Sequence, residues 1–414
     1  MSTDSNKPEN SLPERPDLQH LKNQAKDLLK EGTASSLADA QLSVARSYGF
    51  SSWPKLKLHV ELLQETGQLR EAIQQENLDR VQELMTRNPE LHRAKMGYNG
   101  NGPLTLVCES RTPLTPQRLA IAKWMIENGS DVHQGGDGPL MRSALRDDYL
   151  PMTELLVSHG ADVNATWDGH YPILNAPCET LAGETLDWLL KHGARFRPEV
   201  TVEYCAAIAI GTYWRNPPGK RKCLAVLTEN GCSLPDTAVM AVHRGKVKLL
   251  ADYVRKDPAV IDRRFPEKEF FPFTLPTGSG LHGVSLDGAT LLHMAVEYQE
   301  QEIAEWLIDN GADVNAATTT DSEGFGGHTP LYHTIVTPAR KTDELASRLL
   351  SAGADARHEA TFRKLLSASG EPEKAPVQEY HNATVLDFAD QFPVADMLNH
   401  PAISAIRAHV EKSQ

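Results

Sequence analysis

A five-residue segment that recurs along the chain constrains its fold more than any other feature. Gly311–Asn315 reads Gly-Ala-Asp-Val-Asn, Gly160–Asn164 is identical to it, and Gly129–His133 differs from it at two positions. Weaker copies begin at Gly193, Gly231 and Gly353. The six glycines are 31, 33, 38, 80 and 42 residues apart. A period near 33 residues with insertions predicts a stack of similar units, and the gap of 80 residues leaves room for one more.

Each unit has the pattern of two short helices followed by a turn. Thr329-Pro330 predicts a helix start, because threonine caps free N–H groups and proline fits the first helical position. A following stripe at residues 345, 346, 349 and 350 is apolar, and residues 303, 304, 307 and 308 repeat it one unit earlier. The glycine of the recurring segment then ends the helix. Neither helix can bury its stripe alone, so the units are expected to stack.

These residues resemble the ankyrin repeat family. Its signatures correspond here to Thr290–His293 with Gly311–Asn315, and to Thr329–Tyr332 with Gly353–Asp355. The resemblance implies an all-α ankyrin solenoid of about nine helix-turn-helix units over residues 66–410. It also implies a function, since ankyrin arrays bind other macromolecules through their concave surface and turn fingers.

Residues 14–65 are predicted to form a separate small helical module ahead of the repeats. Apolar stripes recur in this range, and the segments Ser36–Leu42 and Tyr48–Pro54 resemble a module that precedes bacterial ankyrin arrays. This resemblance implies a bacterial source. Residues 1–13 are polar and are expected to be a disordered tail.

Composition excludes several classes of function. The formal net charge is −13, which disfavours binding to the phosphates of nucleic acids. No apolar run approaches the roughly 20 residues that cross a bilayer, so neither a nucleic-acid nor a membrane partner is expected. The five cysteines are scattered and form no Cys-x-x-Cys motif, which favours reduced thiols in a cytoplasm.

Three insertions, at residues 265–286, 317–327 and 357–381, are candidates for a functional site. Loops of this length are costly to order, and they concentrate aromatic, carboxylate and imidazole side chains on neighbouring units. Under an enzyme hypothesis, the candidate catalytic residues are Asp321, Glu323, His328 and His381. The candidate ligand-binding residues are His282, Phe325, His333, Tyr380 and Trp214.

Two functions therefore remain open at this stage. The first is a protein-binding module, and the alternative is an enzyme with an acid/base or metal-assisted site that acts on a small polar substrate such as a sugar. No metal-binding motif, phosphate loop or nucleophile elbow is present, so the sequence assigns no metal and no cofactor. Structural roles compete for each candidate: His333 can serve packing, and Asp321 and Glu323 can be solvated loop carboxylates.

Overall fold

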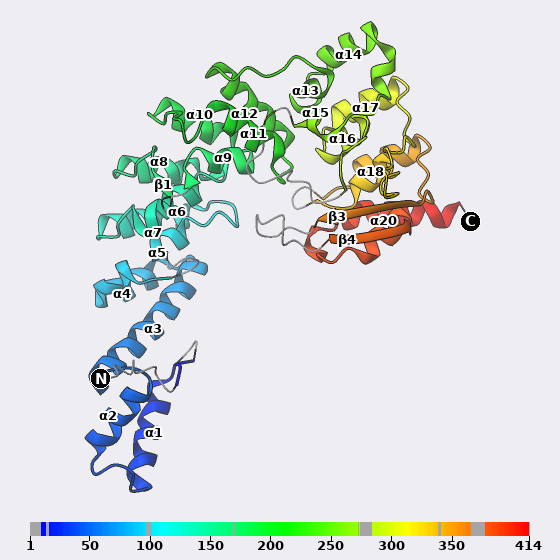
Figure 1. Ribbon diagram of the computed structural model, residues 1–414. Coiled ribbons are helices and arrows are strands. Elements are labelled where there is room, and N and C mark those ends of the chain that lie inside the picture. Colours follow the sequence, from blue (N-terminus) through cyan, green and yellow to red (C-terminus); the bar gives the residue numbers. More distant parts are fainter. Residues whose placement is uncertain are drawn as a thin grey trace, which may run out of the picture. The chain divides into compact units, whose positions relative to one another are not determined.

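The computed structural model describes residues 10–13, 16–96, 101–167, 169, 171–271, 273, 284–337, 341–365 and 377–413. The chain divides into two compact units. Unit 1 comprises residues 1–143 and 151–161, and unit 2 comprises residues 144–150 and 162–414. Figure 1 colours unit 1 mainly in blue to cyan and unit 2 mainly in green to red.

Unit 1 is helical throughout its described residues. Its elements are α1 (Leu18–Lys30), α2 (Leu37–Ser47), α3 (Trp53–Gln74), α4 (Leu78–Arg87), η1 (Pro89–Arg93), α5 (Pro103–Val107), α6 (Pro116–Glu127), α7 (Gln134–Ser143) and most of α8 (Leu150–Ser158). Gly135, Gly136 and Asp137 have left-handed backbones, so the regular part of α7 begins after them.

The first three helices of unit 1 share a small apolar core. Ser36 and Ser52 cap α2 and α3 by accepting the N–H groups of Asp39 and Lys55, which fixes where these helices begin. The buried side chains of this core are Leu21, Ala25, Ala40, Val44, Ala45, Leu56 and Val60. Helix α3 continues past residue 65 and packs on α4, so one helix joins this core to the first helix pair. The tail expected at 1–13 lies mostly outside the described residues.

Unit 2 is a series of helix pairs with two small sheets. Its helices are η3 (Asp147–Tyr149), α9 (Asn175–Thr180), α10 (Gly183–Lys191), α11 (Val202–Gly211), α12 (Pro217–Glu229), α13 (Ala238–His243), α14 (Val247–Lys256), η4 (Pro258–Ile261), α15 (Glu267–Phe270), α16 (Leu291–Glu297), α17 (Gln301–Asp309), η5 (Pro330–Thr334), α18 (Glu344–Ser351), α19 (Val385–Gln391), η7 (Ala395–Met397) and α20 (His400–Lys412). A single apolar core extends from α13 to α20 and includes Leu307 of the predicted stripe.

The recurring segment folds into turns that explain its composition; we call residues 162–165, 313–316 and 355–358 the finger turns. In the first, Asp162 accepts the N–H of Asn164 at 2.8 Å. The Asn164 amide then binds the turn of the next repeat. It donates to the Gly193 carbonyl at 3.0 Å and accepts from the Arg195 N–H at 2.9 Å. The aspartate therefore closes its own turn, and the asparagine links that turn to the next.

The second finger turn repeats these bonds in the C-terminal half of unit 2. Asp313 accepts the N–H of Asn315 at 2.9 Å. The Asn315 amide donates to the Gly353 carbonyl at 3.0 Å and accepts the Asp355 N–H at 2.7 Å. In both copies, the motif thus has a structural reason for each polar residue.

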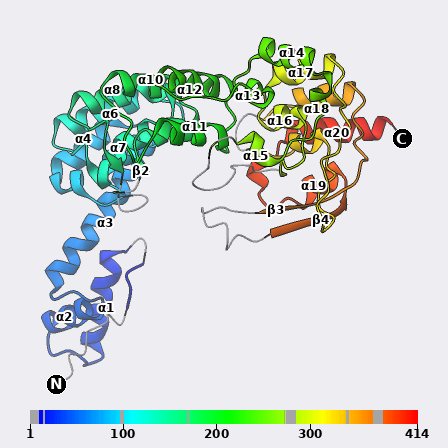
Figure 2. The ribbon, with the colours of Figure 1, turned by 45° about the horizontal axis from the view of Figure 1, so that its top comes forward.

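The described chain is mostly helical, and two small sheets depart from the all-α expectation. Strands β1 (Thr166–Trp167) and β2 (Tyr171–Pro172) form a short antiparallel pair, and β3 (Ala360–Leu365) and β4 (Val377–Ala383) form a longer one. Phe362 pairs with Tyr380 and stacks on it at 4.9 Å, so the predicted insertion 357–381 buries its aromatic side chains as a hairpin. Figure 2 shows this hairpin beside α19, with which β4 makes contact.

Two further observations concern the chain as a whole. Within the residues that the structure describes, no helix combines the length and the apolar composition needed to cross a membrane. All five cysteines are buried as free thiols.

Candidate functional site

A buried carboxylate, Glu297, organises the most strongly charged part of the interior of unit 2. Glu297 is the last residue of α16, a helix whose other residues are buried and mainly apolar. The side chain of Glu297 is 1% exposed, and its Oε1 forms an ion pair with Nη2 of Arg215, whose side chain is 2% exposed. Its Oε2 lies 2.7 Å from Nδ1 of His333. A carboxylate this deeply buried requires such partners, because desolvation strongly disfavours an unpaired charge.

Arg215 is held in place by the connection between α11 and α12. Its Nη1 donates to the Thr212 carbonyl at 2.8 Å, and its Nε donates to the Glu297 carbonyl at 2.7 Å. The guanidinium also lies 4.8 Å from the centre of the Tyr298 ring. The Lys220 ammonium lies over that ring at 4.0 Å. Aromatic faces stabilise cations at such distances, so Tyr298 supports both charges.

A second buried carboxylate accompanies this cluster. Glu300 precedes α17 and is fully buried. Its oxygens lie 3.3 Å from Nζ of Lys220 and 2.6 Å from Nη2 of Arg221. The two glutamates and their cations thus connect α12 with the turn between α16 and α17.

These surroundings determine the charge states of the groups. Burial alone would raise the pKa of Glu297, but the Arg215 charge and the His333 hydrogen bond outweigh it and lower the pKa to about 2. The carboxylate is therefore ionised near neutral pH. Burial lowers the pKa of Lys220 to about 8, and it lowers the pKa of Lys364, whose ammonium is influenced by Glu297 and Arg215, to about 8 as well.

Three histidines, His293, His328 and His333, lie together with ring centres 5.3 to 6.1 Å apart, and the last of them contacts Glu297. His293 contacts Thr290 through Nδ1 and the His328 carbonyl through Nε2, at 2.9 and 3.2 Å. His328 contacts the Ser285 carbonyl through Nε2 at 2.9 Å. Burial, with the neighbouring His333 next in importance, lowers the pKa of His328 to about 3, so its ring is neutral. Both of these rings have structural hydrogen bonds.

His333 differs from its two neighbours. Its Nδ1 faces the ionised carboxylate of Glu297 and therefore carries a proton, which orients the ring with Nε2 on the side away from Glu297. That Nε2 is buried and has no hydrogen-bond partner among the described residues. An imidazole oriented by a carboxylate is the arrangement that accepts a proton or a hydrogen bond from a hydroxyl group.

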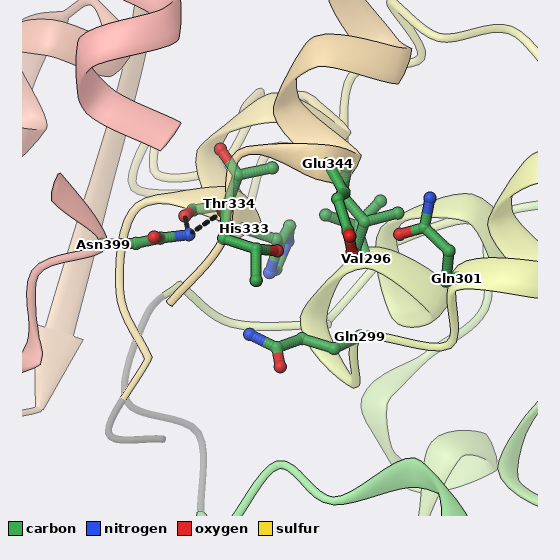
Figure 3. Close-up of a pocket in the computed structure, with 9 residues that line it drawn as sticks. Val296, Gln299, Gln301, His333, Thr334, Glu344 and Asn399 are labelled. Carbon is green, nitrogen blue, oxygen red and sulfur yellow. Dashed lines mark hydrogen bonds between the residues drawn. The ribbon is translucent and has the colours of Figure 1, made fainter. Parts of the chain in front are cut away.

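A small pocket, with room of about 20 Å³ for a water-sized molecule, adjoins His333. Figure 3 shows the ring of His333 between Asn399 on one side and Val296 on the other. This room is far below the roughly 300–1,000 Å³ of typical ligand pockets. The pocket is lined by Val296, Gln299, Gln301, His333, Glu344, Leu345 and Asn399, among others.

Four of the predicted site residues lie together on the exposed outer side of β3. Arg363 Nη2 binds Asp321 at 2.9 Å and Glu323 at 2.5 Å. The same guanidinium lies 4.1 Å from the ring centre of Phe325, and His381 lies 6.0 Å from that ring. Asp321 also accepts the N–H groups of Glu323 and Phe325, so it shapes its own loop. We call Asp321, Glu323, Phe325, Arg363 and His381 the exposed cluster.

The other predicted residues are placed elsewhere. His328 and His333 belong to the buried histidines described above. Tyr380 is fully buried between Phe362 and Phe388. Trp214 is half-buried and stacks on Tyr213. His282 lies outside the described residues.

Sequence reasoning missed Glu297, Lys364 and Asn399. One signal for Glu297 was available, since it closes the otherwise mainly apolar helix 291–297 and a carboxylate there must find buried partners. In the described parts of the chain, no group of three His, Cys, Asp or Glu side chains is arranged to hold a metal ion.

Comparisons with known proteins agree with the repeat pattern. The ankyrin repeat family model matches residues 135–168 and 287–319. A fowlpox virus (strain NVSL) protein whose name describes it as an ankyrin repeat protein is 27% identical over 268 residues, which cover 59% of this chain. The match spans about two fifths (41%) of the viral protein's length. The chain therefore contains ankyrin repeats, and this part of the sequence prediction is confirmed.

Proposed function

We propose that this protein is a protein-binding module of a bacterial cytoplasm. The ankyrin repeats support the proposal, because stacked repeats keep a constant core while offering an extended surface of variable side chains. The free, buried thiols are compatible with a reducing compartment, and the N-terminal sequence resembles modules of bacterial ankyrin proteins.

The observation that carries this proposal is the hairpin that extends the first finger turn of unit 2. Thr166 pairs with Pro172 and Trp167 with Tyr171, directly after residues 162–165. Trp167 and Tyr171 are half-buried, and their ring centres are 6.4 Å apart. Tryptophan and tyrosine are enriched among the residues that dominate binding energy at interfaces. We therefore assign Trp167 the role of an anchor for the partner.

The test uses two tryptophans of unit 2. The full-length protein is used to capture partners from a bacterial lysate, and a captured protein is purified for calorimetric titration. Trp167→Ala is expected to weaken its binding about tenfold or more without changing the melting temperature. The matched control is Trp188→Ala, since Trp188 is also half-buried but lies on α10, stacked on His192.

Equal affinities of the wild type and Trp167→Ala would contradict the role of the hairpin, as would an equal loss in Trp188→Ala. Failure to retain any protein specifically would contradict the proposed function itself. The alternative, an enzyme for a small polar substrate, needs a proton-exchanging group beside a pocket. Within the described residues, His333 fits that need better than the exposed Asp321 and Glu323.

A further inference from the structure

We propose that the surface around Glu179 in unit 2 binds a positively charged side chain, an arginine or a lysine, of a protein partner. We call Trp167, Tyr171, Tyr213, Trp214 and Glu179 the aromatic surface. This inference rests on the proposed protein-binding function and goes further, because it names the chemistry that the partner presents. Three features support it: the placement of the rings, the partners of the carboxylate and the charge of the chain.

Two separate segments bring four aromatic rings to one carboxylate. The β1–β2 hairpin carries Trp167 and Tyr171, and the connection between α11 and α12 carries Tyr213 and Trp214, whose ring centres are 5.9 Å apart. Glu179 lies on α9, which contacts β2 and α11, and Figure 1 shows α9 beside α11. The Tyr171 hydroxyl donates to Glu179 Oε2 at 2.5 Å, and the Tyr213 hydroxyl donates to Oε1 over a longer 3.4 Å. Each aromatic pair therefore has one member bonded to the carboxylate.

Further hydrogen bonds hold the second pair of rings beside α9. The Thr212 hydroxyl donates to the Glu179 carbonyl and accepts the Trp214 N–H, the latter at 3.2 Å. Burial, and next the charge of Glu179, raise the pKa of Tyr171 and of Tyr213, so both phenols stay protonated and remain donors. These groups are thus positioned within unit 2 before a partner arrives, and such preorganisation lowers the entropic cost of binding.

The carboxylate of Glu179 has neutral partners and lacks a counter-charge. Among the residues that the structure describes, no lysine, arginine or histidine forms an ion pair with it. Asp187 in the same unit is the contrast, since its 18% exposed side chain pairs with Lys191 at 2.8 Å and with Lys222 at 3.2 Å. Partial burial disfavours a carboxylate without such a partner, and its two oxygens accept about four hydrogen bonds in all. A cation from a binding partner therefore finds both a charge to neutralise and oxygens to bind.

The aromatic rings favour the same kind of group. Cations are attracted to the faces of tryptophan and tyrosine, and this chain already places Arg215 and Lys220 over the Tyr298 ring. The four rings of the aromatic surface and Glu179 are half-buried, so part of each remains open to solvent. The formal net charge of −13 also attracts a basic partner from a distance. Glu179 would repel an acidic side chain and would gain no counter-charge from a neutral one.

The test is an NMR titration of the full-length protein labelled with ¹⁵N-tryptophan, followed through the indole resonances. The probes are the acetylated and amidated tripeptides Gly-Arg-Gly and Gly-Lys-Gly. The neutral control is the same tripeptide with citrulline, which has the shape of arginine without its charge. We expect a charged peptide to shift the Trp167 and Trp214 resonances in a saturable manner, and citrulline to bind about tenfold more weakly or less. Trp188 and Trp306, on α10 and α17, are internal references whose resonances should stay fixed.

Variants then assign the effect to the carboxylate. Glu179→Gln keeps an oxygen that accepts from Tyr171 but removes the charge, so it is expected to weaken binding of the charged peptide about tenfold. The matched control is Glu184→Gln, which changes the net charge equally at an exposed carboxylate of α10 that pairs with Lys222. If Glu179→Gln fails to fold, the comparison of the arginine and citrulline peptides on the wild type still decides the inference.

Three results would overturn the inference. The first is equal binding of the arginine and citrulline peptides, and the second is a linear, unsaturated response of both indoles to both charged peptides. The third is an equal loss in Glu179→Gln and Glu184→Gln, which would reduce the effect to the overall charge of the protein. The peptides report on this surface alone, so a negative result overturns the inference while the capture experiment still decides the proposed function.

Discussion

The two faces of β3 carry charged residues in opposite environments. Arg363 belongs to the exposed cluster, where it binds Asp321 and Glu323, whose side chains are 45% and 64% exposed. The next residue, Lys364, has its ammonium near Glu297 and Arg215, whose side chains are almost fully buried. Successive side chains of a strand alternate between its faces, so one residue separates a solvated ion cluster from a buried one.

This contrast determines what each cluster can do. Solvent screens the exposed ion pairs, and holding two long side chains in one geometry costs entropy, so these pairs contribute little to stability. The buried cluster has no solvent to replace a lost partner, and it fixes the tautomer of His333 beside a pocket. The chemistry open to a carboxylate in this protein therefore depends on its burial and its partners, as at Glu297, and not on its position in a long loop, as at Asp321 and Glu323.

The largest expected effect is the loss of the buried carboxylate. Glu297→Ala leaves the buried Arg215 and His333 without their partner, so we expect the free energy of unfolding to fall by about 3–5 kcal/mol. Glu323→Ala in the exposed cluster is the control and should leave the urea midpoint nearly unchanged. Equal midpoints for both variants would mean that Glu297 is not buried with its two partners.

A second difference should appear in acid. Burial holds the pKa of His328 at about 3 in the folded protein, against an ordinary value of 6.5. Between these values the unfolded chain binds more protons, so stability should fall as the pH decreases from 6.5 towards 3. His328→Gln should flatten this fall, whereas His381→Gln in the exposed cluster should not. Urea midpoints measured across that pH range check this prediction. Parallel plots of midpoint against pH for the wild type and His328→Gln would contradict it.

A third, smaller effect is a change in stability at alkaline pH that distinguishes Lys364 from its neighbour Arg363 on β3. Burial lowers the pKa of Lys364 from 10.5 to about 8. The unfolded chain therefore binds the additional proton between pH 8 and 10.5, and stability should rise with pH across this window. Lys364→Met should remove part of that rise, while Lys220 retains the rest. Arg363→Met is the control, and the free energy of unfolding is measured against pH for both variants. An equal change in the slope of that plot would contradict the prediction, because it would place both side chains in the same environment.

The repeat pattern made much of the fold predictable, because its determinants are local. Asp313 and Asn315 close and link turns by bonds that the identical copy at Asp162 and Asn164 also makes. Leu307 is fully buried in the predicted stripe. The β3–β4 pair was missed because its two strands, of six and seven residues, lie eleven residues apart, and that spacing is not one of the tight turns that identify a hairpin from sequence. Loop length and composition marked residues 357–381 as a candidate functional region. They do not reveal which face of a strand a residue occupies.

The buried cluster was harder to predict for a physical reason. The partners of Glu297 lie 82 residues before it at Arg215 and 36 residues after it at His333. Helical periodicity relates residues within a few turns and carries no information about such contacts. His333 was named as a candidate ligand-binding residue, but its orientation by Glu297 could be recognised only in three dimensions.

The smallest expected effect is the salt dependence of the two clusters. A double-mutant cycle of Arg363→Met and Glu323→Gln should give a small coupling that disappears in about 1 M salt, where the Debye length is ~3 Å. Solvent ions reach the exposed pair, so they compete with it directly. The corresponding cycle of Arg215→Met and Glu297→Gln should keep its larger coupling under the same conditions, because ions cannot enter between fully buried groups. Urea unfolding at low and high salt measures both cycles. A buried coupling that fell with salt as steeply as the exposed one would show that water and ions reach Glu297.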